Sequence, residues 1–148
     1  MSAKNAPAFR MTRGRRAGDA IMSALIRGGV VPHSYLLTTR GRRTGRLRTT
    51  PVTLVEGDGH RFLVAPYGAV SWVLNARAAG EVILSRRGHS TAYRVREVGA
   101  GEAGSVLKRY IRMARPTRPY FRATPEAPVA DFVAEAGRHP VFELVAPA

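Results

Sequence analysis

The segment from residue 36 to residue 52 carries the side chains and backbone features that bind phosphate groups. Its central turn, Arg40 to Arg46, holds four arginines and the glycines Gly41 and Gly45, and threonines stand at positions 44, 49 and 50. Glycine lets backbone N–H groups approach a ligand closely, and arginine offers fork-shaped donors to phosphate oxygens. The spacing differs from that of a Walker loop, which ends in Gly-Lys-Ser/Thr. We therefore predict an anion site here, with a solvated basic hairpin turn as the alternative.

The charge of the whole chain also points to an anionic partner. The 148 residues carry 24 Lys and Arg against 10 Asp and Glu, a formal net charge of +14. Such a field attracts nucleic acid, anionic lipid or a phosphorylated cofactor, and charge alone does not choose among them. Nucleic acid is the least favoured, because aromatic residues are only 7% of the chain and Trp72 is its single tryptophan, so few bases could stack.

Several kinds of catalytic site are excluded by what the sequence lacks. Without cysteine there is no disulfide, thiolate nucleophile or cysteine-ligated zinc. The histidines, His33, His60, His89 and His139, are too scattered to form a helical metal site, so no metal is predicted. We expect His139 to be structural and His60 and His89 to be solvated. No Ser-His-Asp arrangement stands out, so no covalent intermediate is expected.

Short strands joined by turns must position these residues. Alternating apolar residues and turn signals predict strands over 34–39, 47–55, 60–65, 81–85, 90–98 and 141–145. Helical periodicity predicts helices over 20–26, 71–79, 102–113 and 128–136, with Ser71 capping the second, while prolines make 115–125 irregular.

The order of these elements predicts the fold class. The strands follow one another in meander order without βαβ units, which favours a mainly β fold: a small, closed or partly closed antiparallel barrel with peripheral helices. Residues 1–16 are expected to form a flexible basic arm and residues 17–148 a single domain. With no membrane-spanning stretch and no signal peptide in the sequence, the expected compartment is the cytoplasm.

The run from Leu36 to Pro51 resembles the signature of the deazaflavin-dependent nitroreductase family, also called the flavin/deazaflavin oxidoreductases. That signature reads Thr-Thr-x-Gly-Arg-(Lys/Arg)-(Ser/Thr)-Gly-x-x-Arg-Thr-x-Pro, and this chain matches it at Thr38, Thr39, Gly41, Arg42, Arg43, Thr44, Gly45, Arg48, Thr49 and Pro51. A second block is also similar: Ala65 to Gly68, followed by Trp72, Asn75, Arg77 and Ala78. It departs from the family pattern in a shorter loop before Trp72 and in Ala79-Gly80, where members carry Asn-Pro. The resemblance covers roughly residues 34–98.

The resemblance implies a split β-barrel of the FMN-binding-like kind and coenzyme F-420 as the cofactor, with FMN as the alternative. The cofactor's phosphodiester would then be held by the loop residues Arg42, Arg43, Thr44, Gly45, Arg48 and Thr49. Its deazaflavin ring would be lined by Pro51, Val52, Ala65, Pro66, Tyr67 and Gly68. Contacts to the ring edge or to the polyglutamate tail would come from Trp72, Asn75 and Arg77. Apolar surface for the ring is expected from the barrel wall at Leu54, Leu63 and Val64.

The same resemblance implies hydride transfer from the reduced cofactor to a quinone, a nitroaromatic or an activated double bond. The accompanying proton would come from solvent or from a tyrosine, with Tyr67 and Tyr120 as the catalytic candidates and Tyr110 as a third. Two alternatives stay open: a non-catalytic carrier of F-420, FMN, heme or lipid on the same barrel, and a basic nucleic-acid-binding protein. A homodimer and peripheral contact of the basic arm with the inner face of a membrane also stay open.

Overall fold

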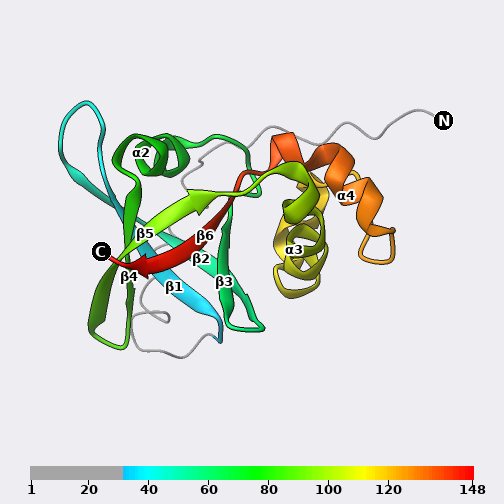
Figure 1. Ribbon diagram of the computed structural model, residues 1–148, viewed down its shortest axis with the longest axis horizontal. Helices are drawn as coiled ribbons and strands as arrows, with labels where there is room; N and C mark the ends of the chain where they lie inside the picture. The colour runs from blue at the N-terminus through cyan, green and yellow to red at the C-terminus, as the bar shows by residue number, and fades with distance from the viewer. Residues whose placement is uncertain (1–31) are drawn as a thin grey trace.

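Six antiparallel strands form a closed barrel in the computed structural model, which describes residues 32–148. The strands are β1 (Ser34–Arg40), β2 (Leu47–Gly57), β3 (His60–Val64), β4 (Glu81–Arg86), β5 (His89–Glu97) and β6 (Val141–Pro147). They follow the order β1-β2-β3-β6-β5-β4 around the barrel, and all neighbouring pairs are antiparallel (Figure 1). The predicted antiparallel barrel is thus confirmed. The predicted arm, residues 1–16, and the predicted helix over 20–26 lie outside the described residues.

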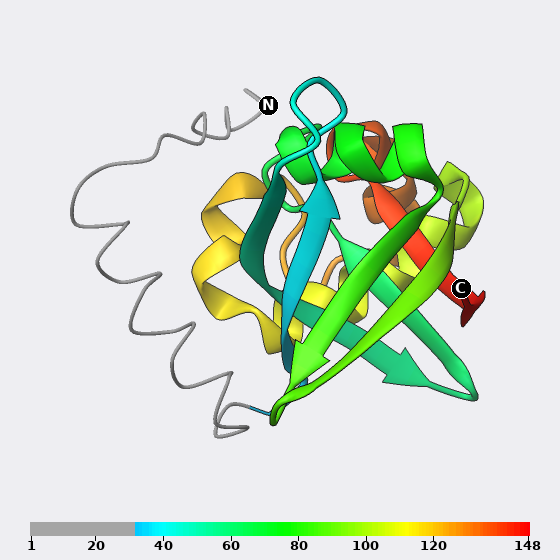
Figure 2. The ribbon, with the colours of Figure 1, turned by 90° about the vertical axis from the view of Figure 1, so that its left-hand side faces the viewer.

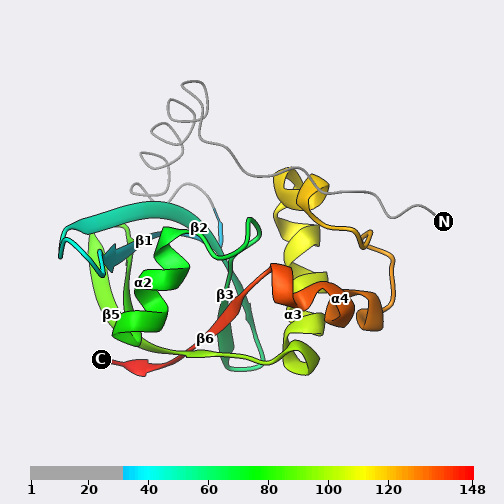
Figure 3. The same ribbon diagram turned by 90° about the horizontal axis from the view of Figure 1, so that it is seen from above.

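Short helices connect the strands and cover two parts of the barrel. They are α2 (Ser71–Ala79), α3 (Ala100–Met113), η1 (Arg115–Tyr120), α4 (Val129–Glu135) and η2 (Ala136–Arg138), of which η1 and η2 are 3-10 helices. Figures 1 and 3 show α3 and α4 side by side on one flank of the barrel, away from α2.

Three local predictions were wrong. Ser71 does not cap α2 but begins it, because Val70 occupies the N-cap position and makes no side-chain hydrogen bond. Helix α3 begins at Ala100, ahead of the predicted Glu102, with Gly99 as its N-cap. The segment 115–125 was predicted irregular, yet Arg115–Tyr120 forms a 3-10 helix with a proline in its first turn. Proline is tolerated there because the first N–H groups of a helix have no partner within it.

The barrel interior is one hydrophobic cluster that α2 closes. Inward-facing residues of the strands meet two residues of α2 in this cluster; its buried members are Leu37, Leu54, Leu63, Ala65, Val73, Ala76, Val82, Leu84, Phe142 and Leu144. Leu54 and Leu63 are each 0% exposed. The expectation that Leu54 and Leu63 present apolar surface to a ligand ring was therefore wrong, because both side chains point into the barrel.

A second hydrophobic cluster joins the outer face of the barrel to the helices α3 and α4. On the strands it contains Val55, Phe62, Val64 and Val141, which are packed against Val106, Leu107, Tyr110 and Ile111 of α3 and Phe132 of α4. Val64 belongs to this outer cluster and is also buried, so it offers a ligand no surface either. We call α3, η1 and α4, together with η2, the helical layer.

Close packing of α3 on α4 predicts opposite effects for two glycines of the same helix. A Cβ built on Gly104 would lie 2.5 Å from Val133 Cγ2 and 3.1 Å from Val129 Cγ1, whereas a Cβ on Gly101 would meet nothing within 4 Å. Gly101→Ala is expected to stabilise by up to about 1 kcal/mol through helix propensity. Gly104→Ala is expected to destabilise, because overpacking costs about 1–3 kcal/mol. Urea unfolding of both variants measures this difference, and equal effects would contradict it.

Candidate functional site

The turn between β1 and β2, Arg40 to Arg46, closes on itself through its own backbone. The Gly41 N–H donates to the carbonyl oxygen of Arg46 at 2.7 Å, and the Gly45 N–H donates to that of Gly41 at 2.8 Å. Gly45 has a φ of 71°, a left-handed conformation that glycine adopts without strain. The Thr44 hydroxyl accepts the Arg46 N–H at 3.2 Å, so this predicted phosphate contact also stabilises the turn. The arginines of the turn thus project from a well-defined backbone.

Asn75 of α2 fastens this turn to the body of the protein. Its Oδ1 accepts both the backbone N–H and the Nη1 of Arg42, each at 3.1 Å. Its Nδ2 donates to Thr39 Oγ1 at 3.2 Å, and the residue is only 2% exposed. Figure 2 shows the turn lying beside α2. Asn75, predicted to contact the ring edge or tail, has both ends of its amide engaged inside the protein and acts on the site by holding the turn.

Three exposed arginine side chains of this region have no partner within residues 32–148. The guanidinium groups of Arg43, Arg46 and Arg48 make no hydrogen bond or ion pair with any residue in this part of the chain. Thr39 pairs with Arg48 in the β1–β2 register, and its hydroxyl hydrogen bonds to Asn75. The Arg48 side chain therefore leaves the sheet on the face where Arg42 contacts Asn75. Unpaired guanidinium groups held near one another are well suited to an anion with several oxygens.

Arg77, also predicted to contact the cofactor, forms an ion pair within the protein. Its Nε and Nη2 donate to the two carboxylate oxygens of Glu97 at 2.8 and 2.7 Å. This bidentate pair joins the end of α2 to the end of β5. Trp72 is half-buried against the barrel cluster, with its ring 5.8 Å from that of Phe142. Whether Arg77 or Trp72 touches a cofactor stays a prediction.

Strand β2 continues beyond the end of its pairing with β3, and we call this stretch of β2, unpaired on that side, the opening. These strands pair only from Leu54↔Leu63 to Gly57↔His60. Continuing the register would place Pro51 opposite Pro66, and neither residue has an N–H to donate, so the ladder could not extend that far. The free edge of β2 at Pro51 and Val52 therefore faces the segment Ala65–Gly68. These are the two segments predicted to line a deazaflavin ring with backbone groups.

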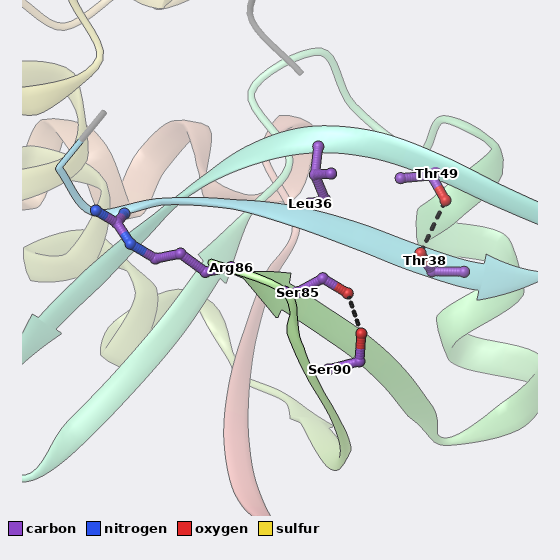
Figure 4. Close-up of a pocket in the computed structure, with 7 residues that line it drawn as sticks. Leu36, Thr38, Thr49, Ser85, Arg86 and Ser90 are labelled. Carbon is purple, nitrogen blue, oxygen red and sulfur yellow. Dashed lines mark hydrogen bonds between the residues drawn. The ribbon is translucent and has the colours of Figure 1, made fainter. Parts of the chain in front are cut away.

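The outer face of the barrel carries a polar pocket next to this edge. Its volume is about 280 Å³, and its lining is Leu36, Thr38, Thr49, Ser85, Arg86, Gly88 and Ser90 (Figure 4). The hydroxyls of Thr38 and Thr49 lie 2.8 Å apart, and those of Ser85 and Ser90 lie 2.7 Å apart. The Arg86 guanidinium points away along β1, where Nη1 donates to the Ser34 carbonyl oxygen at 2.8 Å.

Strand alternation divides the predicted contacts on β2 between two faces. Pro51 pairs with Leu36 and shares the outer face with Thr49. Val52, in contrast, packs against the interior cluster. Its side chain is therefore turned away from the outer-face pocket.

The two tyrosines predicted to be catalytic meet in space. Tyr67 lies in the segment after β3 and Tyr120 at the end of η1, and their rings are 4.7 Å apart at an interplanar angle of 76°. Both are half-buried. Tyr110, the third candidate, is buried in the outer cluster, and burial followed by the nearby Tyr67 raises the pKa of its phenol. Tyr110 is thus poorly suited to donate a proton to a ligand.

Other sequence predictions are settled by individual contacts. His139 is buried, as expected of a structural residue, and hydrogen bonds to Glu135 and to the Pro66 carbonyl. His60 was expected to be simply solvated, but its Nδ1 lies 2.8 Å from Glu143 Oε1. Glu135 was missed, although its i, i+4 spacing from His139 was a usable signal.

Among residues 32–148, no group of three His, Cys, Asp or Glu could hold a metal, and no helix could cross a membrane.

The role of Asn75 leads to a prediction for Asn75→Ala. The change removes the acceptor of the part-buried Arg42 N–H and the donor to the buried Thr39 hydroxyl, and an unsatisfied buried group costs about 1–3 kcal/mol. We expect a loss of stability of that size and weaker binding of any anion held by the turn. Anion titration and urea unfolding measure the two effects, and Val73→Ala, a buried apolar residue of the same helix, serves as the control for lost stability. Unchanged anion affinity in Asn75→Ala would contradict the holding role.

The sequence and the fold are both similar to those of known proteins. A family model described as F-420H(2)-dependent quinone reductase matches residues 8–129. A solved F-420-H2 dependent reductase is similar with a TM-score of 0.54 and 23% identity, over 77% of this chain and 95% of that one. A structure described as a domain-swapped dimer has a TM-score of 0.56 and 23% identity, over 89% and 96%. A heme binding protein from Mycobacterium smegmatis has a TM-score of 0.54 at 9% identity, over 84% and 50%. These likenesses show the fold, and no curated protein matches the sequence.

Proposed function

The chain belongs to the F-420H(2)-dependent quinone reductase family, and from this premise we propose that its Arg40–Arg46 turn and the opening between β2 and β3 together bind coenzyme F-420. The protein is accordingly an oxidoreductase that uses this cofactor, and a quinone is the acceptor that the family description names. The observation that carries the proposal is the group of Arg43, Arg46 and Arg48, whose guanidinium groups have no partner within residues 32–148. Arg43 and Arg46 lie on a turn fastened to α2 by Asn75, and Arg48 lies at the start of β2.

The residues present fit the parts of this cofactor. Its phosphodiester needs several cationic donors, and beside Arg42 the turn offers the guanidinium groups of Arg43 and Arg46, with that of Arg48 at the start of β2. Its flat ring needs a slot, and the free edge of β2 at Pro51 faces Ala65–Gly68 where the ladder ends. The polar pocket beside Thr49 suits a hydroxylated or carboxylated chain. FMN has a ring and a phosphate too, so it stays the alternative cofactor.

Phosphate contacts alone are too weak to hold the cofactor. Charged hydrogen bonds contribute about 1.5–3 kcal/mol each, and association costs about 4–15 kcal/mol, whereas micromolar binding needs about −8 kcal/mol. The ring must therefore bury apolar surface. Because Leu54, Leu63 and Val64 are inaccessible, we assign this surface to Pro51 and Trp72 beside the opening, while Tyr67 and Tyr120 are left to contact the acceptor.

The cofactor supplies the hydride when it is bound, and the protein orients it and excludes water. Tyr67 and Tyr120 stand at the end of the opening next to the helical layer. We propose that one of these phenols hydrogen bonds to the acceptor and donates the proton that accompanies reduction. An acceptor would then lie between this tyrosine pair and the ring.

Titration with F-420 and, separately, with FMN tests the cofactor, with Trp72 and cofactor fluorescence as signals. We expect micromolar or tighter binding of F-420 and oxidation of reduced F-420 on addition of a soluble quinone. A nitroaromatic and an enone run in parallel test the other acceptors. Binding of FMN alone would overturn the cofactor assignment, and binding of neither would overturn the site.

A homodimer is a separate proposal. It is supported by the similar structure described as a domain-swapped dimer. Light scattering coupled to gel filtration tests it, with a mass of twice 16.1 kDa as the expected result. Membrane contact through residues 1–16 stays a prediction, because these residues lie outside the described part of the chain.

A further inference from the structure

A buried carboxylate and a buried imidazole lie side by side beneath the tyrosine pair. Glu135, at the end of α4, is 6% exposed and His139 is 2% exposed. The Glu135 carboxylate accepts the backbone N–H of Arg122, at 3.1 Å from each oxygen, and the N–H of Ala123 at 2.8 Å. His139 Nε2 lies 2.8 Å from Glu135 Oε1. A buried carboxylate needs such partners, and the two amides belong to the chain directly after Tyr120 and Phe121.

The other nitrogen of His139 contacts the segment that carries Tyr67. Nδ1 lies 2.9 Å from the carbonyl oxygen of Pro66. A carbonyl only accepts, so Nδ1 carries a hydrogen and donates it. The contact between Nε2 and Oε1 needs one further proton, whichever of the two groups formally holds it. The imidazole ring is also stacked on Phe121, with centroids 3.9 Å apart and an interplanar angle of 18°.

The pair thus joins the two chain segments that bring the tyrosines to the site. Glu135 fixes the backbone after Tyr120, and His139 fixes the carbonyl before Tyr67. The tyrosine rings meet edge to face, 4.7 Å apart. We propose that Glu135 and His139 are positioning residues that set the relative placement of Tyr67 and Tyr120 for proton delivery to the acceptor. This inference rests on the proposed function of that site.

Stability alone is a weak reason for such a pair in this place. Desolvation of a buried carboxylate and imidazole offsets much of their attraction, so apolar residues of similar volume often stabilise as well or better. Apolar residues could fill the space, but they could not hold the Pro66 carbonyl and the two amides in fixed directions. The pair therefore supplies directional contacts between two segments far apart in the sequence.

Two substitutions of His139 separate its two contacts. The side-chain nitrogen of asparagine can take the place of Nδ1, so His139→Asn is expected to keep the hydrogen bond to the Pro66 carbonyl. Glutamine reaches the place of Nε2, so His139→Gln keeps a donor to Glu135 and loses the bond to Pro66. Val106→Ala is the control for lost packing. Val106 lies in the same outer cluster, and its side chain makes no hydrogen bond to the segment of Tyr67 or to that of Tyr120.

The kinetic test compares these variants at a temperature where each is folded. We expect kcat for quinone reduction to fall about tenfold or more in His139→Gln relative to His139→Asn, because small misplacements of reacting groups have effects of this size. The Kd for F-420 is expected to change by less than about threefold in both, since the turn at Arg43 is far from the pair. If kcat instead falls in all three variants in proportion to their loss of Tm, the pair is merely structural and the proposal is overturned.

A second measurement needs no cofactor. In protein labelled with 3-fluorotyrosine, we expect the fluorine resonances of Tyr67 and Tyr120 to shift in His139→Gln, while those of Tyr35 and Tyr93 in the barrel stay in place. Unmoved Tyr67 and Tyr120 signals would overturn the positioning role. This result is independent of the proposed function, which fails on its own if wild-type protein neither binds F-420 nor reduces a quinone.

Discussion

Replacing both Arg43 and Arg48 with alanine is expected to weaken F-420 binding by about 10²- to 10⁴-fold. Both side chains lack partners among the described residues, so the change removes no internal contact and stability should be nearly unchanged. A hydrogen bond to a charged group contributes about 1.5–3 kcal/mol, so two of them give about 3–6 kcal/mol, and each 1.4 kcal/mol is a factor of ten. Fluorescence titration of wild type and variant measures the loss directly.

A control variant with the same change of net charge separates two causes of lost affinity: the loss of direct arginine contacts and the weakening of the overall positive field. Lys108 and Arg112 both lie on α3, on the flank of the barrel away from the Arg40–Arg46 turn (Figures 1 and 3). Replacing both with alanine should lower F-420 affinity by less than about threefold, because exposed charges beyond about 10 Å are screened at ordinary salt. Equal losses in the two double variants would show that the chain attracts the cofactor by its net charge of +14 alone.

The strands and the basic turn could be predicted from the sequence because their signals are local. Alternation over residues 34–39 predicts a strand without reference to the rest of the chain. The pair Asp58-Gly59 likewise predicts a tight hairpin, and its φ values are 52° and 76°. The same holds for the glycines and arginines of the Arg40–Arg46 turn. The fold class followed from the order of these elements.

What could not be predicted depends on contacts between distant segments. Alternation shows that Leu54 and Leu63 share a face, but not that this face is the barrel interior rather than a ligand site. The direction of the Asn75 amide depends on where the Arg42 backbone lies, 33 residues away in the chain. The contact of His139 with Pro66 spans 73 residues and leaves no mark in a local pattern. For each of these side chains the residue type suggested a role, but the contacts that it makes are visible only in the structure.

The separation of the two hydrophobic clusters predicts that the two ends of the site can be damaged independently. The turn that we propose to hold the phosphate is fastened to α2, which packs on the barrel interior, whereas Tyr120 and Glu135 belong to the helical layer. Phe132 is 0% exposed and packs within the outer cluster. Phe132→Ala is expected to cost about 3–5 kcal/mol, a large part of the roughly 5–15 kcal/mol that stabilises a domain.

In Phe132→Ala we therefore expect quinone reduction to be lost far more than F-420 binding. The helical layer should open locally, so hydrogen exchange should quicken in α3 and α4 while β1, β2 and α2 stay protected. The Kd for F-420, measured at low temperature, should rise by less than about tenfold, whereas kcat should fall by more, because Tyr120 loses its fixed place beside Tyr67. Phe132→Leu, a smaller change, should show the same pattern to a lesser degree if Phe132→Ala does not fold.

Leu84→Ala is the matched control for this experiment, since Leu84 is 4% exposed in the barrel interior and its truncation costs about 2–5 kcal/mol. It should quicken exchange in the barrel strands and lower kcat and F-420 affinity together, because the turn and the opening both depend on the barrel. Identical patterns in Phe132→Ala and Leu84→Ala would mean that the domain unfolds as one unit. The phosphate end and the acceptor end would then have no separate structural support.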